Sequence, residues 1–284
     1  MKFYLGCAVW SYKGWVGNFY PPHSRPADFL SLYGQRLTTV ECNTTFYAVP
    51  GQEIVARWAQ QTPSGFKFCP KLPRQVTHEG LLTPAISSAL HFYERMGLLG
   101  DKLGSVFAQL PPSYSPEYFD DLIPFLQTLA SQSVPLALEV RHLDWFQAQY
   151  AEELNKLLSE LGIGRVILDT RPIYNCPDDP QIESERRKPQ LPLQSSLTAP
   201  FTLIRFISHP QQEFNQPYLE EWAQKIESWL PQGTTVYFFV HCPTEEHSPH
   251  TARHFQHLLE AKGVEVPPLP WDNLELPPLQ LSLF

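Results

Sequence analysis

Residues 135–141 read PLALEVR, an apolar run that ends in the charged residues Glu139 and Arg141. A near-continuous apolar run of this length is typical of a strand buried on both faces, as in a parallel sheet. Seven further runs have the same character: FYLGCAVW (3–10), TTVECNTTF (38–46), FKFCPKL (66–72), GSVFAQL (104–110), RVILDT (165–170), TLIRFIS (202–208) and TVYFFVHC (235–242). The sequence therefore predicts eight strands of a buried parallel sheet.

Helical patterns separate most of these runs. They cover residues 27–36, 52–61, 85–99, 116–130, 147–161, 217–230 and 249–262. Eight alternations of strand and helix predict a single closed (β/α)8 barrel of the TIM type, spanning residues 1–284. An open doubly wound sheet is the alternative, although the sequence lacks the glycine-rich turn that normally follows the first strand of such a sheet.

Two segments interrupt the alternation. Residues 171–200 are rich in proline and have a charged centre. This segment follows the sixth strand and would project from the carboxyl end of the barrel, where it could be a lid or a plain surface insertion. The tail, residues 264–284, is rich in proline and leucine, and we expect it to pack on the barrel exterior through Trp271.

Composition excludes several classes of protein. The 284 residues are 43% hydrophobic, which suffices for a full core, and the net charge of -8 disfavours broad nonspecific binding to nucleic acid. Five cysteines without a CxxC pair indicate buried thiols in a reducing cytosol. The sequence shows no signal peptide and no apolar run long enough for a bilayer, so we expect a cytoplasmic protein without a membrane partner.

Polar residues gather at the predicted strand ends, which in TIM-type barrels build the active site. They are Glu41, Asn43, Lys71, Gln109, Glu139, Arg141, Asp169, Arg205 and His241. Glu41 and Asn43 are two residues apart, as are Glu139 and Arg141, so each pair shares one face of its strand. The sequence therefore predicts one polar site at the barrel mouth.

Lys71, Arg141 and Arg205 would suit an anionic substrate, such as a phosphate or a carboxylate. Glu41 and Glu139 would exchange protons once burial separates their pKa values, and Asp169 and His241 are further catalytic candidates. The remaining candidates are substrate-binding: Asn43 and Gln109 as orienting groups, Trp10, Tyr12, Phe46 and Tyr47 as walls beside Trp15 and Trp145, and His78, with His142 as a secondary candidate. The predicted function is acid–base catalysis by a hydrolase, lyase or isomerase on a small or terminal anionic, phosphorylated or sugar-like substrate.

Several alternatives remain open. The three acids could neutralise the three cations in a salt-bridged plug, which would leave a scaffold without a ligand. His241 could join the acids in binding a divalent metal, although no HxH or HExxH pattern and no nucleotide-cofactor motif supports a cofactor. His250, His254 and His257 share a helix face that we expect to be solvated. A basic rim at residues 186–188 would suit a nucleotide-binding protein or a nuclease-like barrel.

Five stretches resemble, in order, the signatures of the YecE-like proteins, the domain-of-unknown-function family numbered 72. They are WSYKGWVGNFYP (10–21), VECNTTFYAVP (40–50), PKLPRQVTH (70–78), FAQLPPSY (107–114) and LALEVRHLDWF (136–146). The resemblance covers nearly the whole chain and implies a TIM-type barrel of uncharacterised function. The family's Glu-x-Asn, Thr-His and Glu-x-Arg patterns carry over to Glu41, Asn43, Thr77, His78, Glu139 and Arg141.

The chain departs from the family pattern at three strand ends. Residues 7–9 read Cys-Ala-Val where a small polar Thr-Ser-Gly is expected, and Arg205 is followed by Phe-Ile-Ser-His in place of Leu-His-Gly. The last strand ends in His241 and Cys242, where asparagine is usual. These departures suggest a distinct subgroup with an altered pocket.

Overall fold

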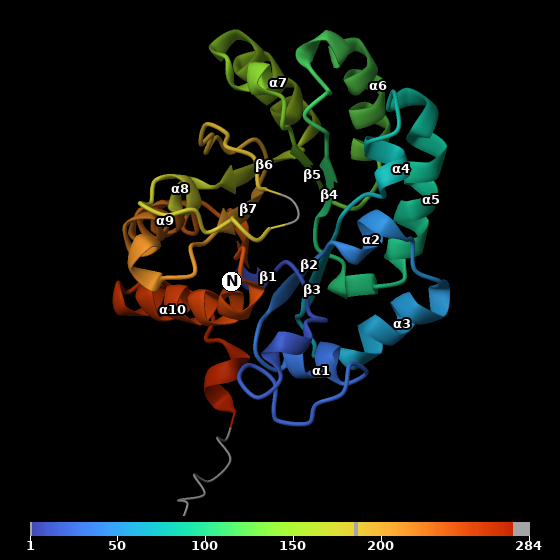
Figure 1. Ribbon diagram of the computed structural model, residues 1–284. Helices are drawn as coiled ribbons and strands as arrows, with labels where there is room; N and C mark the ends of the chain where they lie inside the picture. Colours follow the sequence, from blue (N-terminus) through green and yellow to red (C-terminus); the bar gives the residue numbers. More distant parts are fainter. Residues whose placement is uncertain (1, 185–186, 275–284) are drawn as a thin grey trace, which may run out of the picture.

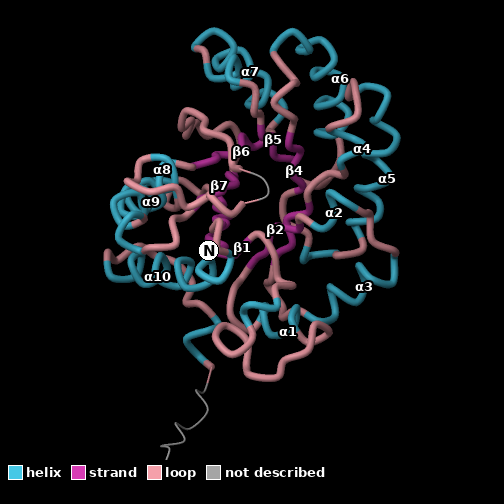
Figure 2. The backbone as a smooth tube through the Cα atoms, in the orientation of Figure 1, coloured by secondary structure: helices cyan, strands magenta, loops and turns pink. Residues whose placement is uncertain are grey.

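The structure, a computed structural model, describes residues 2–184 and 187–274. Eight parallel strands form a nearly closed barrel, and the helices surround it (Figures 1 and 2). The strands are β1 (Phe3–Cys7), β2 (Thr39–Cys42), β3 (Lys67–Pro70), β4 (Val106–Gln109), β5 (Leu136–Glu139), β6 (Gly164–Asp169), β7 (Phe201–Ile207) and β8 (Thr235–His241). Each strand overlaps its predicted apolar run, so the predicted barrel is confirmed.

The order of the strands around the barrel is β3-β2-β1-β8-β7-β6-β5-β4. Two backbone hydrogen bonds bridge the remaining seam between β3 and β4: Leu72 N–H donates to Phe107 O at 2.9 Å, and Gly104 N–H donates to Phe68 O at 2.8 Å. An open doubly wound sheet would have two separated edges here. The alternative of an open sheet is therefore wrong.

The longer helices lie where the sequence predicts them. They are α1 (Phe29–Gly34), α3 (Gln52–Gln61), α5 (Ile86–Gly97), α6 (Phe119–Ala130), α7 (Ala148–Leu161), α9 (Gln216–Trp229) and α10 (Ser248–Ala261). Three one-turn helices were not predicted: α2 (Thr44–Tyr47), α4 (Arg74–Thr77) and α8 (Arg171–Tyr174). All three follow strand ends, so they shape the carboxyl end of the barrel. None of the helices that the structure describes has the length and apolar character needed to span a bilayer.

Short 3-10 turns complete the connections. They are η1 (Lys13–Trp15), η2 (Thr83–Ala85), η3 (Gly100–Lys102), η4 (Pro116–Tyr118), η5 (Leu143–Phe146), η6 (Gln212–Phe214), η7 (Glu245–His247) and η8 (Pro270–Asn273). Of these, η7 matters most for the site, because it follows β8 at the carboxyl end of the barrel.

The core has two layers because strand side chains alternate between the two faces of the sheet. A small inner cluster fills the barrel itself: Cys69, Phe107, Ala137, Val166, Phe201, Leu203, Tyr237 and Phe239. A much larger outer cluster lies between the strands and the helices, and it includes Phe238 packed on Trp222 of α9 and Phe255 of α10. The inner cluster forms the floor beneath the polar residues of the mouth.

The described parts of the 171–200 segment, residues 171–184 and 187–200, follow β6, and Arg187 and Lys188 lie beside the strand-end residues at the carboxyl end of the barrel (Figure 1). Tyr174 donates its hydroxyl hydrogen to the backbone oxygen of Lys188, and the Lys188 N–H donates to Gln181 Oε1 at 2.7 Å. These contacts bring Lys188 over the barrel mouth. The role of this segment as a lid stays a prediction.

The described part of the tail lies on the outside of the barrel. Val264 and Leu269 are buried in the outer core cluster. Trp271 packs edge-on against Phe19 with ring centroids 4.9 Å apart, and the Arg253 guanidinium lies 4.7 Å from its ring. The rest of the predicted tail, residues 275–284, is outside the described residues.

Candidate functional site

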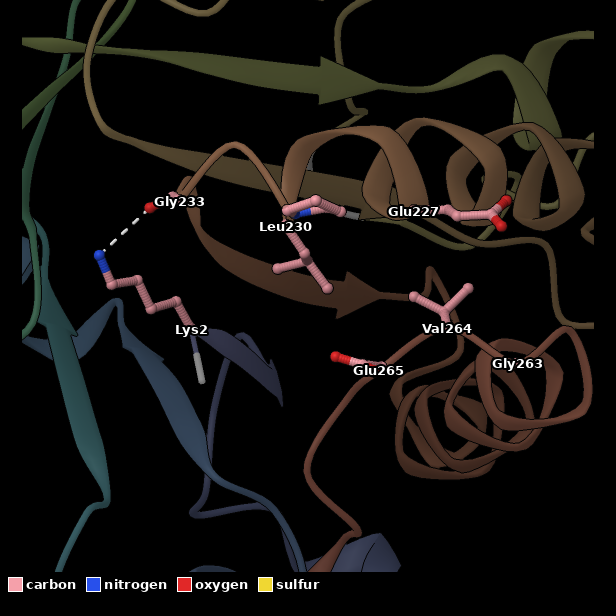
Figure 3. A pocket seen from close by; sticks show the side chains of 8 residues that line it. Lys2, Glu227, Leu230, Gly233, Gly263, Val264 and Glu265 are labelled. Carbon is pink, nitrogen blue, oxygen red and sulfur yellow. Dashed lines mark hydrogen bonds between the residues drawn. The ribbon is translucent and has the colours of Figure 1, made fainter.

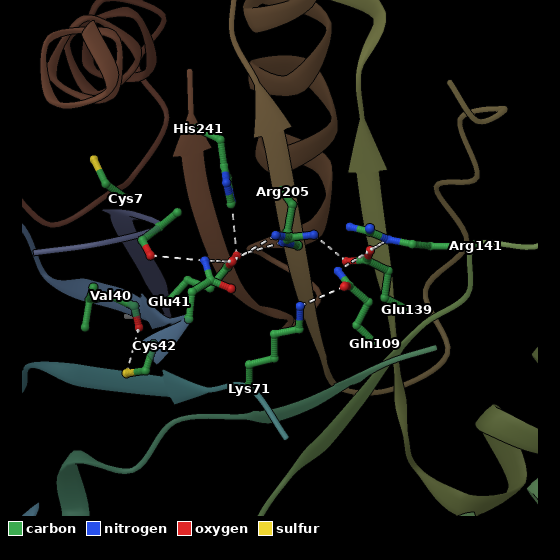
Figure 4. Close-up of polar contacts among 12 residues, drawn as sticks. Cys7, Val40, Glu41, Cys42, Lys71, Gln109, Glu139, Arg141, Arg205 and His241 are labelled. Atoms are coloured by element: carbon green, nitrogen blue, oxygen red, sulfur yellow. Dashed lines mark hydrogen bonds and ion pairs between the residues drawn. The ribbon is translucent and has the colours of Figure 1, made fainter. Parts of the chain in front are cut away.

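Two buried carboxylates share one arginine at the carboxyl end of the barrel (Figure 4). Arg205 of β7 is only 3% exposed. Its Nε and Nη2 donate to both oxygens of Glu41 at 2.8 and 2.9 Å, and its Nη1 donates to Glu139 Oε2 at 2.6 Å. The planar guanidinium suits this arrangement because its donors form a fixed fork. Arg205 thus ties β7 to β2 and β5 across the barrel.

Glu41 has two further polar partners. Asn43 Nδ2 donates to Glu41 Oε1 at 2.7 Å and to the backbone oxygen of Ala8 at 3.1 Å. His241 Nε2 lies 3.1 Å from Glu41 Oε2. Burial lowers the pKa of His241 to about 4, although Glu41 opposes the shift, so the ring is neutral at pH 7 and donates to the carboxylate.

Glu139 lies in a similar set of contacts. Arg141 Nε and Gln109 Nε2 both donate to Glu139 Oε1 at 2.7 Å. Gln109 turns its Oε1 the other way and accepts from Lys71 Nζ at 2.7 Å. Gln109 therefore connects the amine of Lys71 to the carboxylate layer beneath it.

Both glutamates are ionised in this environment. Burial alone would raise the pKa of Glu41, but the charge of Arg205 and the contact with His241 hold that pKa well below its usual range. Burial opposes the shift at Glu139 as well, but Arg205, Arg141 and Lys71 lower its pKa to about 2. The two carboxylates form a paired layer that holds the cations in place, which disfavours their predicted role as the proton-exchanging pair.

A cavity of about 550 Å³ lies above this layer. The described residues that line it are Val9, Asn43, Phe46, Tyr47, Lys71, Arg74, His78, Gln109, Arg141, Arg187, Lys188 and Arg205. Within this described lining there are six lysine or arginine side chains and no carboxylate. A strongly cationic hollow therefore exists in a chain whose net charge is -8.

Lys71 is a buried lysine in the wall of the cavity. It is 6% exposed, and its Nζ lies 3.9 Å from the centre of the Phe46 ring. Burial and the neighbouring charge of Arg205 lower the pKa of Lys71 to about 7, against the opposing effect of Glu139. Lys71 therefore changes its protonation state close to neutral pH.

His78 also packs against Phe46, edge to face, with ring centroids 4.9 Å apart. Its Nδ1 is 2.8 Å from Thr77 Oγ1. Burial, followed by the charge of Lys71, lowers the pKa of His78 to about 4. The cavity therefore contains a neutral imidazole next to a lysine that is partly unprotonated.

Asp169 does not join the site, and the prediction that it lies in the mouth is wrong. Its Oδ1 and Oδ2 accept from Arg171 Nε and Nη2 at 3.0 and 2.9 Å. The indole Nε1 of Trp222 on α9 donates to Asp169 Oδ2 at 2.8 Å. The side chain thus points outward, toward the helices, because Val166 has the inward parity of β6.

Of the predicted aromatic walls, only Phe46 and Tyr47 line the cavity in the described structure. Trp10 packs in the outer core against Trp58, with ring centroids 5.1 Å apart. The Tyr12 hydroxyl donates to Glu246 Oε1. The prediction that Trp10 and Tyr12 form walls of the pocket is therefore wrong.

Three other aromatic candidates lie elsewhere. Trp15 and Trp145 are buried core residues. His142 accepts the Asp144 N–H at 3.2 Å on Nδ1, and among the described residues it is not part of the cavity wall. Most of the aromatic residues that follow the strands are therefore buried in the outer core and do not line the cavity.

The alternative of a divalent metal held by His241 and the three acids does not fit the described residues. Glu41 and Glu139 have their oxygens engaged by Arg205 and its neighbours, and Asp169 lies on the opposite face of its strand. His241 is bound to Glu41. A divalent ion would have to displace the Arg205 guanidinium from a buried ion pair, so the described residues of the mouth offer no ligand set of this kind.

Cys176, Asp178 and His209 form the one close group of metal-ligand types among the described residues. His209 Nδ1 accepts the Gln211 N–H at 2.9 Å, so Nε2 carries the ring proton and donates to Asp178 Oδ1 at 3.1 Å. A protonated Nε2 has no lone pair for a metal. Hydrogen bonding alone accounts for this group.

The three histidines of α10 face different partners. His250 Nε2 lies 2.9 Å from Asn18 Oδ1, and His254 Nε2 lies 2.7 Å from Gln216 Oε1. His257 Nε2 lies 3.4 Å from Asp272. His250 and His257 are exposed, so the predicted exterior face is confirmed for these two, and His254 is half-buried.

The sequence analysis did not single out two further charged residues that line hollows at the carboxyl end of the barrel. Arg74 lines the cavity from α4, and its position before the Thr77–His78 pair was a usable signal. Glu245 of η7 lies in a second, acidic hollow of about 530 Å³ with Asp178 and Glu246. Burial raises the pKa of Glu245 to about 8.

Of the proposed basic rim, Arg187 and Lys188 do line the cavity, and Arg186 is outside the described residues.

A further hollow of about 500 Å³ lies at the amino end of the strands (Figure 3). Lys2 Nζ donates to the Gly233 backbone oxygen there at 3.2 Å. Leu230 and Val264 form its apolar wall, beside Glu227. Chemistry in TIM-type barrels takes place at the opposite end, so the cationic cavity remains the candidate site.

Comparison with known proteins agrees with the fold and the motifs. The family described as "Protein of unknown function DUF72" matches residues 4–274. The UPF0759 protein YecE of Escherichia coli is 34% identical over 249 residues, which cover 87% of this chain and 88% of that protein. The UPF0759 protein YunF of Bacillus subtilis is 23% identical over 263 residues, covering 82% and 86% of the two chains.

Two crystal structures of a DUF72 family protein from Enterococcus faecalis have the same fold. Their TM-scores are 0.69 and 0.65 at 17% and 18% sequence identity. Both matches cover 91% of this chain. They cover 95% of the first crystallised chain and 98% of the second. The chain therefore belongs to the YecE-like family of proteins of unknown function, DUF72.

Proposed function

We propose that the chain is an enzyme that binds a small anionic substrate, phosphorylated or sugar-like, in the cavity at the barrel mouth and acts on it by acid–base chemistry. The charge of the cavity wall is the main support. Six described lysine and arginine residues line it without a carboxylate among them. Cations gathered in a hollow repel one another, and a bound anion relieves that repulsion.

Arg141 is the best-placed anion ligand. Its side chain is 20% exposed, and among the described residues it donates only through Nε, to Glu139. Its two terminal nitrogens are therefore available for a bidentate contact with a phosphate or carboxylate. Glu139 fixes the guanidinium so that little side-chain entropy is lost on binding.

Lys71 and His78 are the groups suited to proton exchange. The pKa of Lys71 is about 7. The pKa of His78 is about 4, and it would rise when a bound anion offsets the neighbouring positive charge. A general acid or base works best when its pKa lies near the working pH. This assignment replaces Glu41 and Glu139, which are paired and ionised.

Titration calorimetry with inorganic phosphate, sulfate and a set of sugar phosphates tests the anion site. We expect Arg141→Ala to weaken binding by about tenfold or more, as is usual for the loss of a charge-assisted hydrogen bond. The matched control is Arg25→Ala, because Arg25 pairs with Asp28 on the exposed surface. Equal affinities in both variants, or no binding to any of the anions, would rule out the site.

Catalysis is tested by following the same sugar phosphates with phosphorus NMR. We expect turnover to rise as the pH increases through about 7 and to disappear in Lys71→Met. A rate that is unchanged in Lys71→Met would contradict the assignment of the proton-exchanging group.

A nucleotide or nucleic-acid ligand is the second candidate. Tyr47 is 68% exposed beside Arg74 and Arg187, and an aromatic side chain next to cations is the arrangement that stacks single-stranded bases. A short single-stranded oligonucleotide added to the calorimetry set decides between the two. Binding that is tighter for the oligonucleotide than for phosphate, and that falls in Tyr47→Ala, would favour this second candidate.

A further inference from the structure

Lys71 occupies a fixed position at the end of β3. Its backbone pairs with Phe107 across the seam between β3 and β4. Its Nζ is held on one side by the face of Phe46, at 3.9 Å from the ring centre, and on the other by Gln109 Oε1, at 2.7 Å. A surface lysine samples many rotamers, whereas these contacts direct the amine of Lys71 into the cavity.

Lys71 also lacks the charge partner that the neighbouring cations have. Arg205 is paired with Glu41 and Glu139, and Arg141 is paired with Glu139. Within the described structure Lys71 has no carboxylate within ion-pair distance, although it is buried next to these arginines. A buried ammonium without a carboxylate, close to other cations, favours loss of its proton.

The hydrogen bond to Gln109 keeps the neutral amine oriented. An unprotonated amine donates one hydrogen to Gln109 Oε1 and keeps its lone pair available. Gln109 cannot turn its amide freely, because its Nε2 donates to Glu139 at 2.7 Å. The lone pair of Lys71 is therefore presented to the cavity, where Arg141 would hold an anionic group.

An ammonium would serve anion binding better than an amine does. Arginine already supplies permanent positive charge in this cavity. A lysine whose charge is suppressed by its surroundings is instead suited to nucleophilic attack on a carbonyl carbon. Charged arginines beside a neutral Lys71 suit a substrate with two features, an anionic group and a carbonyl.

We propose that Lys71 forms a Schiff base with a small aldehyde or ketone that also has a carboxylate or phosphate group. This inference rests on the proposed anion site and names its substrate class. The amine nitrogen attacks the carbonyl carbon, and the carbonyl π electrons move to oxygen. The proton lost by nitrogen neutralises that oxygen, which gives a carbinolamine.

Loss of water completes the step. The carbinolamine hydroxyl takes a further proton from the solvent and leaves as water, and the nitrogen lone pair forms the C=N bond of the positively charged iminium. No oxidant or reductant is consumed. The iminium then draws electrons from the adjacent carbon, and the neutral imidazole of His78, which also lines the cavity, is placed to accept a proton from that carbon.

Reductive trapping tests this proposal. The folded full-length chain is incubated at about pH 7 with glyoxylate and sodium cyanoborohydride, and the labelled lysines are mapped by peptide mass spectrometry. Glyoxylate has an aldehyde and a carboxylate in one small molecule, and the reduced adduct is a carboxymethyl group on nitrogen. We expect Lys71 to be labelled about tenfold faster than Lys262, an exposed lysine beside α10, and sulfate to slow the labelling of Lys71 alone.

Three outcomes separate the two proposals. In the first, labelling is spread evenly over surface lysines, while sulfate binds and Arg141→Ala abolishes that binding. This result overturns the Schiff-base proposal and supports the anion site. Preferential labelling of Lys71 that sulfate does not slow overturns the link between the two. Absence of both labelling and sulfate binding overturns both. Gln109→Leu is a second variant, expected to slow the labelling of Lys71 through misorientation of the amine while Lys262 is unaffected.

Discussion

At the scale of single residues, Arg205 determines how charge is arranged in the mouth. It binds Glu41 and Glu139 through three nitrogens, and all three side chains are almost fully buried. A buried ion pair adds little net stability, because desolvation offsets the attraction, but removal of one partner leaves a buried charge without compensation. The stability of the barrel therefore depends on keeping the three charges together.

We predict that Arg205→Met lowers the free energy of unfolding by about 3–5 kcal/mol, because two carboxylates lose their partner in the core. Urea unfolding measures this loss. The triple variant with Glu41→Gln and Glu139→Gln should recover part of it, since the amides remove the unpaired charges. A triple variant less stable than Arg205→Met would show that the loss has another origin.

Lys71 gives a prediction about pH. Its pKa falls from the ordinary 10.5 to about 7 on folding, so between these values the unfolded chain binds more protons than the folded chain. Stability from this group therefore increases with pH across that window, by up to about 1.4 kcal/mol per pH unit. Lys71→Met lacks this pH-dependent contribution. Its free energy of unfolding, relative to that of the parent protein, should therefore fall as the pH is raised from about 7 to about 9.5.

Thermal or urea unfolding at several pH values measures this difference. Lys262→Met is the control for loss of a lysine charge, because Lys262 is exposed. A difference between Lys71→Met and the parent that stays constant over the window would mean that Lys71 is fully protonated in the folded protein.

At the scale of elements, the contact between β1 and β2 depends on a side chain from a helix. The Tyr33 hydroxyl on α1 accepts the Cys7 N–H at 2.7 Å and donates to the Thr39 backbone oxygen at 2.9 Å. Gly6 permits this close approach, since a Cβ there would lie 1.9 Å from Thr39 O. A tyrosine thus completes the sheet where two strands pair over only a few residues.

We predict that Tyr33→Phe costs about 1–3 kcal/mol of unfolding free energy, because the buried Cys7 N–H and Thr39 carbonyl lose their partner. Chemical denaturation provides the measurement. Tyr118→Phe is the matched control, since Tyr118 is 42% exposed. Equal effects of the two substitutions would argue against a structural role for the Tyr33 hydroxyl.

At the scale of the whole molecule, the buried charges connect strands on opposite sides of the barrel. Glu139 has a folded pKa of about 2 against an ordinary 4.5, so the folded chain binds fewer protons than the unfolded chain between these values. The stability that this carboxylate contributes is present above pH 4.5 and is lost as the pH falls toward 2. Glu41, whose pKa is also lowered, acts in the same direction.

We therefore predict cooperative loss of the barrel in acid. Unfolding free energy should decrease below about pH 4.5 by up to about 1.4 kcal/mol per pH unit for each of the two carboxylates. Circular dichroism during acid titration measures the transition. Glu139→Gln should have a shallower pH dependence in this window, and an unchanged slope would exclude Glu139 as a source of acid sensitivity.

Much of the fold was predictable because its determinants are local. The eight apolar runs and seven of the helices depend on residue type and spacing within short windows. The inward direction of Glu41 and Glu139 also followed, because their strand neighbours are apolar and need the outer face. Asp169 could not be placed in this way, since Val166, Ile167 and Leu168 before it are apolar on both faces of β6 and do not show which face is inward.

The sequence by itself determined the barrel, the positions of the strand ends and the gathering of charge at one mouth. Only the tertiary structure decided which charges pair there, because the partners Glu41 and Arg205 lie 164 residues apart in the chain. It also decided that Lys71, and neither glutamate, titrates near neutral pH. A pKa depends on burial and on every charge within a few ångströms, and both are properties of the folded chain.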